Sequence, residues 1–342
     1  MKKSYITIIE ELLKLALRVF LLSVLVFTLA RLAPGDPLYA YYGERVEKMS
    51  GQEQEEARER LGLNEPIPVQ YVRWAQGAVH GDFGISYKYK RDVKEVIAER
   101  IGNTLLLGGF GFVLIFVLAL FLGLFCAWRE DRRTDRVVCG IGTFTSCIPD
   151  FWLSLLLILV FSVWLGWLPS SGAYTAGAER GFADRARHLL LPLAVVVLGH
   201  LWYYAYLVRN RLLEETRADY VLLARMKGLS GKQVLYRHCL RNALPSYLSM
   251  MAIAFPHILG GTYVAETVFS YPGIGTLAYE SARYQDYNLL MVVSLMTGIL
   301  VILGNLLAGI LNERIDPRMR LKMERQQEEV GGFCEKDFRD SL

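Results

Sequence analysis

The residues best suited to do chemistry lie together between positions 218 and 245. This stretch reads Ala-Asp-Tyr-Val-Leu-Leu-Ala-Arg-Met-Lys-Gly-Leu-Ser-Gly-Lys-Gln-Val-Leu-Tyr-Arg-His-Cys-Leu-Arg-Asn-Ala-Leu-Pro. Gly228 is placed to end one short amphipathic helix, and Ser230 with Gln233 forms a capping box that starts a second. We expect Pro245 to stop the second helix. Two short helices joined by a small-residue turn suit insertion into a groove on a partner protein, so the chemistry expected here is recognition.

The two expected helices carry an apolar stripe, and a second, overlapping set of residues is predicted to dock the partner. The apolar set is Tyr220, Leu223 and Ala224 on one face of the first helix, and Val234, Leu235, Cys239 and Leu240 on the second. The residues predicted to dock the partner are Asp219, Tyr220, Ala224, Arg225, Lys227, Gly228, Leu229, Ser230, Arg237, His238 and Arg241. The alternative is a basic loop lying against anionic lipid. Lipid binding requires no glycine break between capped helices, so we favour a protein partner.

Several ionisable residues fall inside long apolar blocks, where charge is costly and tends to mark a transport path, and three of them are candidates for lining such a path. His200 and His257 lie near the middle of their blocks, and Glu266 lies towards the end of one. The histidines either contact a substrate or metal, or make hydrogen bonds between packed helices. Glu266 either lines the path or braces its outer gate. Asp150, which follows Pro149, is expected to cap a helix that begins after a break.

The elements that must position these residues are membrane-spanning helices. Of the 342 residues, 53% are hydrophobic, and they gather in blocks long enough to cross a bilayer, which needs about 20 residues. The blocks are residues 13–30, 104–128, 137–168, 189–208, 247–269 and 289–311. A soluble protein would need a shell of amphipathic helices around such blocks, and the sequence offers none. We therefore predict an all-α, polytopic bundle of about six spans.

The distribution of Lys and Arg predicts the orientation of these spans. Basic residues concentrate in 129–136, in 209–241 and in the tail after 313, and they are sparse in 169–188 and 270–288. By the positive-inside rule, both termini are cytoplasmic in the inner (cytoplasmic) membrane. The net charge of +4 follows from this topology and indicates no nucleic-acid partner. Five cysteines without a C-x-x-C pair fit the reducing cytoplasmic side, and no spacing of Cys or His establishes a metal site.

Three regions follow from this topology. Residues 1–96 are predicted to form an anchor helix and an external cap, in which Ser50 and Glu53 form a capping box at the start of a helix. Residues 97–313 are the membrane domain, with the cytoplasmic helices of 218–245. Residues 314–342 form a polar cytoplasmic tail.

Catalytic signatures are absent from the sequence. No G-x-x-x-x-G-K-[ST] loop occurs, because Gly228-Leu229-Ser230-Gly231-Lys232 lacks both the spacing and the strand context. Neither G-x-S-x-G nor H-E-x-x-H is present. We therefore expect no enzymatic step and no cofactor in this chain.

The segment 224–245 resembles the coupling motif of permeases from binding-protein-dependent ABC importers, and in detail the peptide/nickel branch. The resembling residues are Ala224-Arg225-Met226-Lys227-Gly228-Leu229-Ser230 and Arg237-His238-Cys239-Leu240-Arg241-Asn242-Ala243-Leu244-Pro245. Further similar stretches are 31–37, 81–86, 266–275 and 316–318, so the resemblance covers nearly the whole chain. Leu222-Leu223 stands where the general motif has Glu-Ala, Gly102 where the branch often has proline, and Ala308 where an aspartate is expected.

The resemblance implies a type I importer permease that works by alternating access. Its partners would be a second homologous permease, two ATPase subunits that bind ATP, and an external substrate-binding protein. The substrate would be a small peptide or a nickel or other metal chelate. The alternative is an ATP-independent channel or secondary carrier. A carrier would usually show paired short or broken helices repeated between its two halves, and the sequence shows no such pair.

Overall fold

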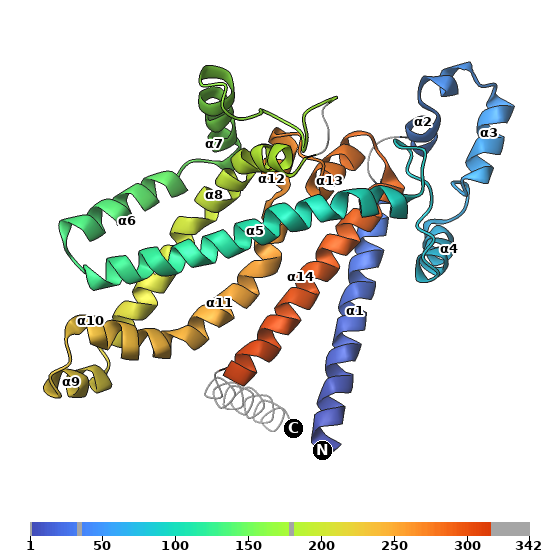
Figure 1. The fold of residues 1–342 in the computed structure, drawn as a ribbon. Helices are drawn as coiled ribbons and strands as arrows, with labels where there is room; N and C mark the ends of the chain where they lie inside the picture. The colour runs from blue at the N-terminus through green and yellow to red at the C-terminus, as the bar shows by residue number, and fades with distance from the viewer. Residues whose placement is uncertain (1, 33–35, 178–180, 316–342) are drawn as a thin grey trace, which may run out of the picture. The chain divides into compact units, whose positions relative to one another are not determined.

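The computed structural model describes residues 2–32, 36–177 and 181–315, and it is built from helices (Figure 1). In chain order they are α1 (Lys2–Leu32), α2 (Pro37–Tyr42), the 3₁₀ helix η1 (Gly43–Lys48), α3 (Gly51–Arg60), α4 (Ile67–Val79), α5 (Val93–Trp128), α6 (Arg133–Ser146), α7 (Asp150–Leu157), the π-helix η2 (Ile158–Trp164), α8 (Phe182–Thr216), α9 (Asp219–Met226), α10 (Gly231–Val234), the π-helix η3 (Leu235–Cys239), α11 (Leu240–Gly261), α12 (Tyr263–Val268), α13 (Ile274–Arg283) and α14 (Tyr287–Ile315). One isolated bridge, Ile85 to Asp92, is the strand-like pairing within the described residues.

The chain divides into two compact units that share the long helices. Unit 1 comprises Met1–Phe112, Ile148–Gly199 and Ile258–Ile302, and unit 2 comprises Val113–Cys147, His200–His257 and Leu303–Leu342. The helices α5, α8, α11 and α14 each begin in one unit and end in the other. Unit 1 holds the N-terminal helices and the candidate residue Glu266, whereas unit 2 holds the histidines and the predicted docking segment.

Five stretches of helix are long and apolar enough to cross a membrane, and the pair α6 with α7–η2 makes a sixth if it is one span. This confirms the prediction of an all-α bundle with about six spans. The block 137–168 was predicted as one span, but the helix breaks between α6 and α7. The cause is Pro149, which has no N–H for the helical ladder and disfavours helical backbone at Ile148. A helix begins after this break as predicted, but the prediction that Asp150 caps it was wrong: Pro149 is the N-cap residue, Asp150 is the first helical residue, and the start of α7 has no side-chain capping bond.

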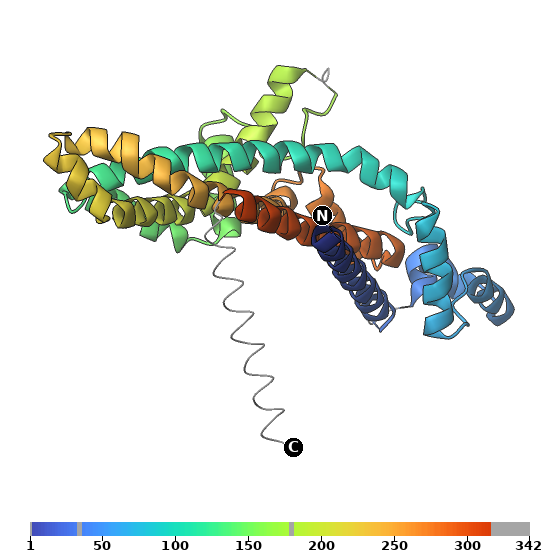
Figure 2. The same ribbon diagram turned by 90° about the horizontal axis from the view of Figure 1, so that it is seen from below.

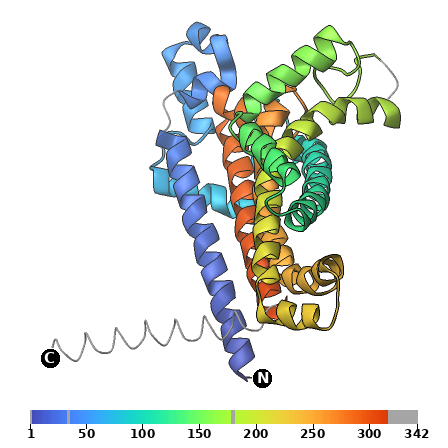
Figure 3. The same cartoon turned by 90° about the vertical axis from the view of Figure 1, so that its left-hand side faces the viewer.

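The predicted cap of unit 1 contains α2, η1, α3 and α4, which follow the C-terminal end of α1 (Figure 3). Ser50 and Glu53 exchange both bonds of a capping box at the start of α3, as the sequence predicted. In α4, the rings of Tyr71 and Trp74 pack against Phe27 of α1, with centroids 5.4 and 6.0 Å from its ring. The cap is thus joined to the anchor helix by aromatic packing.

A buried carboxylate holds the segment before α5 onto the start of α14. Asp286 is fully buried; it accepts a hydrogen bond from the hydroxyl of Ser86 and another from the backbone N–H of Lys88 at 3.1 Å. The helix α5 starts at Val93, so the predicted boundary between residues 96 and 97 falls inside it. The predicted tail 314–342 lies almost wholly outside the described residues, which end at 315.

Candidate functional site

The predicted docking segment folds as two helices joined at Gly228. The first, α9, ends at Met226, and Gly228 follows with φ = +82°, a backbone conformation that glycine adopts freely. Ser230 then caps α10, because its hydroxyl accepts the N–H of Gln233 and the Gln233 side chain accepts the N–H of Ser230. Figures 1 and 2 show α9 and α10 side by side in unit 2. The local structure predicted from the sequence is present on both sides of the turn.

The second helix does not stop at Pro245, so that prediction was wrong. The four residues of α10 pass directly into η3 and then into α11, which contains Pro245 and Pro256 and ends at Gly261. In η3 the N–H of Leu240 bonds to the carbonyl of Leu235, a wider turn than an α-helix makes. Proline removes a single N–H from the ladder, and an apolar helix tolerates that loss where neighbouring groups adjust. The docking segment is therefore continuous with a span.

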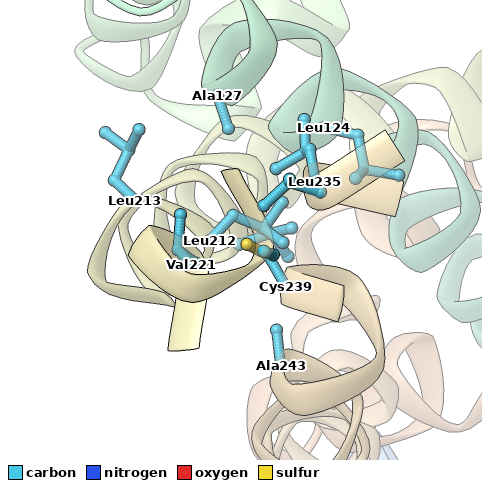
Figure 4. Packing of buried hydrophobic residues seen from close by; sticks show 11 residues of the cluster. Leu124, Ala127, Leu212, Leu213, Val221, Leu235, Cys239 and Ala243 are labelled. Carbon is cyan, nitrogen blue, oxygen red and sulfur yellow. The ribbon is translucent and has the colours of Figure 1, made fainter. Parts of the chain in front are cut away.

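A buried apolar cluster lies against the inward faces of both helices (Figure 4). It is formed by Leu124, Ala127, Val208, Leu212, Leu213, Val221, Ala224, Val234, Leu235, Cys239 and Ala243. These residues come from α5, α8, α9, α10, η3 and α11, all within unit 2. Leu212 and Cys239 are fully buried at its centre. Because packed interiors resist deformation, α9 and α10 are fixed to the end of α8 and the start of α11.

The opposite surface of the helix pair is exposed and mostly basic. The exposed members of the predicted docking set are Asp219, Arg225, Lys227, Gly228, Ser230, Arg237 and Arg241, and the half-buried ones are Tyr220, Leu229 and His238. Ala224 is buried in the cluster, so it packs α9 inward and offers no surface to a partner. Leu223 was predicted on the same face as Ala224, but its side chain points outward and is 55% exposed. Val221 takes its place, since positions three apart share a helix face.

Three exposed apolar residues of α9 were absent from the predicted docking set. Leu222, Leu223 and Met226 are 65%, 55% and 78% exposed. Once Val221 and Ala224 are known to face inward, the 3.6-residue period places these three on the outer side. The surface that results is an apolar ridge with Arg225 and Lys227 beside it, and it fits a groove that is apolar at its floor and acidic at its rim.

Tyr220 joins α9 to the end of α8. Its hydroxyl donates to the Glu215 carboxylate at 2.7 Å, and Glu215 also pairs with Arg211 at 3.1 Å. Desolvation, with the bond to Glu215, raises the pKa of Tyr220 above its ordinary value, so the hydroxyl stays a donor. Tyr220, which we predicted to dock the partner, thus also orients α9.

The two mid-span histidines lie together in unit 2. The rings of His200 on α8 and His257 on α11 stand edge to face, with centroids 6.2 Å apart. His257 is exposed and His200 is half-buried. No sequence pattern indicates that these residues, 57 positions apart, are neighbours. The contact fits either of the two interpretations, a substrate contact or a packing contact, and their role stays a prediction.

Glu266 is buried in unit 1 and is fully occupied by hydrogen bonds. Its carboxylate accepts the hydroxyls of Thr104 at 2.7 Å and Thr262 at 3.0 Å, and the backbone N–H groups of Gly275 at 2.7 Å and Thr276 at 3.3 Å. A Cβ on Gly275 would lie 2.9 Å from the carboxylate and 2.7 Å from the Cα of Tyr263. The glycine lets the N-terminus of α13 close over Glu266, which favours the bracing interpretation over a path-lining one.

Comparison with known families agrees with this architecture. Residues 119–321 match the binding-protein-dependent transport system inner membrane component, and residues 6–108 match the N-terminal part of such membrane components. The chain therefore belongs to the family of binding-protein-dependent transport system inner membrane components. It is a transmembrane permease subunit of an ABC importer, a class that works with ATPase and substrate-binding subunits. The ATP-independent channel or carrier considered as an alternative finds no support.

Two named relatives align with this chain over nearly their whole length. The oligopeptide transport system permease protein AppB of Bacillus subtilis is 36% identical over 299 residues, which is 87% of this chain and 94% of that protein. A Brucella ovis protein named as a peptide permease is 35% identical over 301 residues, 88% of this chain and 94% of that protein. The inward-facing MetNI methionine ABC transporter matches with a TM-score of 0.54 at 18% identity, over 65% of this chain and 97% of that one. This last likeness concerns the fold alone.

If Glu266 is a brace, its removal is expected to lower stability. Glu266→Ala leaves the N–H groups of Gly275 and Thr276 buried without an acceptor, at about 1–3 kcal/mol each. Glu266→Gln keeps one acceptor oxygen for them and is expected to melt within a few degrees of the wild type. The measurement is thermal unfolding in detergent, followed by size-exclusion chromatography, with Glu214→Ala as an exposed control. A Glu266→Ala variant that melts at the wild-type temperature would contradict the brace.

If His200 and His257 contact the substrate, replacing both by glutamine is expected to abolish uptake while the ATPases remain bound. Glutamine preserves hydrogen-bonding capacity but not the ring or its charge. Uptake into vesicles measures the first effect, and co-purification of the ATPases measures the second. Unchanged uptake by the double variant would assign both histidines to helix packing.

Proposed function

We propose that α9 and α10, with the basic residues that follow in η3 and α11, are the element through which the ATPases drive this permease. The observation that carries the proposal is the exposed ridge around Gly228, held on a buried cluster that also contains α8 and α11. An apolar ridge bordered by Arg225, Lys227 and Arg237 suits docking into a groove on another subunit. Lipid alone would require neither the two capped helices nor the left-handed turn between them.

The continuity of α10 with α11 supports a mechanism for coupling. Force applied at Gly228 acts on α9 and α10, which are packed against Leu212 and Leu213 of α8. It also acts along the backbone, because η3 joins α10 to α11 without a loop. Two spans therefore move with the docked ATPases. Closure of the ATPases on nucleotide would tilt these spans, and hydrolysis would reset them, which is alternating access.

The partner set follows from the same proposal. A second, homologous permease encloses the path with this chain, two ATPase subunits dock beneath, and a binding protein delivers the substrate from outside. ATP is bound by the ATPases, so this chain carries no cofactor and no enzymatic step of its own. We propose small peptides as the substrate, since the curated relatives described above are named as peptide permeases. Titration of the cognate binding protein with peptides and with Ni²⁺ tests that choice against a nickel chelate.

The proposed orientation places both termini and the docking segment in the cytoplasm, and the cap outside. It rests on the Lys and Arg distribution along the sequence. The cap helix α3 begins after exposed Ser50, and the docking segment contains exposed Ser230. These two serines report on opposite sides of the membrane.

We expect S50C, and not S230C, to react with a membrane-impermeant thiol reagent applied to intact cells. Cys239 is fully buried and would report nothing from either side, whereas Cys147 is exposed and should first be replaced by serine. Permeabilised cells supply the control, in which both introduced cysteines should react. Labelling of S230C in intact cells would reverse the proposed orientation and with it the docking of the ATPases.

Gly228→Val is expected to uncouple the importer without affecting membrane insertion. A β-branched residue at φ = +82° costs about 1–2 kcal/mol and also crowds the partner's groove. The matched control is Gly231→Val, since both glycines have open space around the added Cβ and only Gly228 has a positive φ. The expected result is normal abundance, weakened co-purification of the ATPases and loss of uptake. Arg225→Ala should weaken ATPase co-purification and uptake to a smaller extent, because it removes one docking charge.

The control variant Gly231→Val should retain both ATPase binding and most of the uptake. Wild-type transport by Gly228→Val, with its ATPases bound, would show that this segment is not the coupling element.

A further inference from the structure

Two cysteines and a buried aspartate converge in unit 2. Cys126 lies near the end of α5, and Asp135 and Cys139 lie one turn apart on α6. Their two sulfur atoms and one carboxylate oxygen all lie within 4.8 Å of one another. Cys126 is 3% exposed and Asp135 is 2% exposed, while Cys139 is half-buried. Both cysteines are free thiols.

The carboxylate of Asp135 has two different sides. Oδ2 accepts the Nη2 of Arg209 at 2.7 Å and the N–H of Asp131 at 3.2 Å. Oδ1 accepts the Nε of Arg209 at 2.9 Å and the thiol of Cys139 at 3.5 Å. Both oxygens therefore accept from Arg209, and Oδ1 also faces the thiol of Cys139. A thiol proton between sulfur and Oδ1 occupies the position that a cation would take.

We propose that Cys126, Cys139 and Oδ1 of Asp135 form a binding site for a thiophilic divalent cation such as Zn²⁺ or Cd²⁺. In a tetrahedral zinc site with Zn–S bonds of about 2.3 Å, ligand atoms stand about 3.8 Å apart. Atoms already within 4.8 Å reach that spacing by small side-chain rotations. Water fills the fourth position.

The charges of the site balance when the cation is bound. Two thiolates and one carboxylate carry three negative charges, and a divalent cation with the Arg209 guanidinium carries three positive ones. Arg209 therefore stays in place: its Nη2 keeps the bond to Oδ2 and orients the ligating carboxylate, as partners of metal ligands commonly do. A neutral assembly is the form that a buried site tolerates best. Each cation bound releases two protons, one from each thiol, so affinity rises with pH.

A cleft of about 440 Å³ is lined by Glu130, Asp131 and Glu214, together with Arg209 and Arg217. Arg209 borders this cleft and also bonds to Asp135, so this side chain is shared by the cleft and the site. Arg217 pairs with Glu130, which leaves Asp131 and Glu214 as the acidic groups of the cleft beside Arg209.

The experiment is titration with Cd²⁺ of the assembled importer without its binding protein, in lipid nanodiscs. We expect a thiolate-to-cadmium charge-transfer band in the ultraviolet that saturates at one cation per copy of this chain. Calorimetry in buffers of different ionisation enthalpy should detect two protons released per cation. C126S and C139S should each lose the band and bind Cd²⁺ at least tenfold more weakly.

The matched controls are C147S, which replaces an exposed cysteine of the same region, and C239S, which replaces a buried cysteine of another cluster. Both should keep the band, the stoichiometry and the proton release. Size-exclusion profiles establish whether each variant folds. If C126S does not fold, C139S still tests the proposal, because Cys139 is only half-buried. Cd²⁺ binding that is unchanged in C139S would overturn the proposal. A Cys126–Cys139 disulfide in the untreated importer, seen as two missing titratable thiols, would overturn it as well.

Discussion

A peptide group surrounded by apolar atoms must find its hydrogen bond within the chain, and the architecture follows from this constraint. Helices satisfy it locally, which is why α1, α5, α8, α11 and α14 run unbroken through their apolar blocks. At several places where the described chain leaves the helical path, a side chain supplies the missing partner. Glu266 accepts the N–H groups at the start of α13, Asp286 accepts that of Lys88, and Ser230 accepts that of Gln233. Each of these three turns is held by a specific acceptor.

The same need for backbone hydrogen bonds keeps the proposed docking segment continuous with a span. A loop between α10 and α11 would have absorbed force as bending. The π-turn of η3 instead keeps backbone bonds in sequence through Cys239 and into α11. The buried cluster then ties α9, which has no such continuity, to α8 through Val221 and Ala224. Under the proposed coupling, movement of the ridge at Gly228 is converted into movement of the spans.

Buried charge has a different purpose in each unit. Glu266 and Asp286 in unit 1 accept only neutral donors, and they fix turns near the ends of spans. Asp135 in unit 2 instead faces Arg209 and ties α6 to α8, with both partners largely buried. A pair of this kind is costly to break, because either member alone would be an uncompensated charge. The two thiols beside Asp135 add a chemical property that packing alone does not need.

Local sequence determined the helices, their caps and the class of protein. Apolar blocks about 20 residues long specify spans without reference to the rest of the chain, and the Ser50 and Ser230 capping boxes need only residues three positions apart. Gly228 was recognised for the same reason, since a left-handed turn is a local property. The motifs around it were enough to identify the permease family.

Tertiary structure alone decided which residues meet and which faces stay exposed. The approach of His200 to His257, the four donors around Glu266 and the convergence of Cys126 with Cys139 join positions distant in sequence or on different helices, and no local pattern encodes such distances. Leu223 and Ala224 were assigned to one face because both are apolar, but the position of the α8 end determines which is buried. Pro245 was read as a stop because local propensity opposes helix there. Its place at the start of a long apolar helix overrode that propensity, since a helix secured by packing over many turns tolerates the loss of one backbone bond.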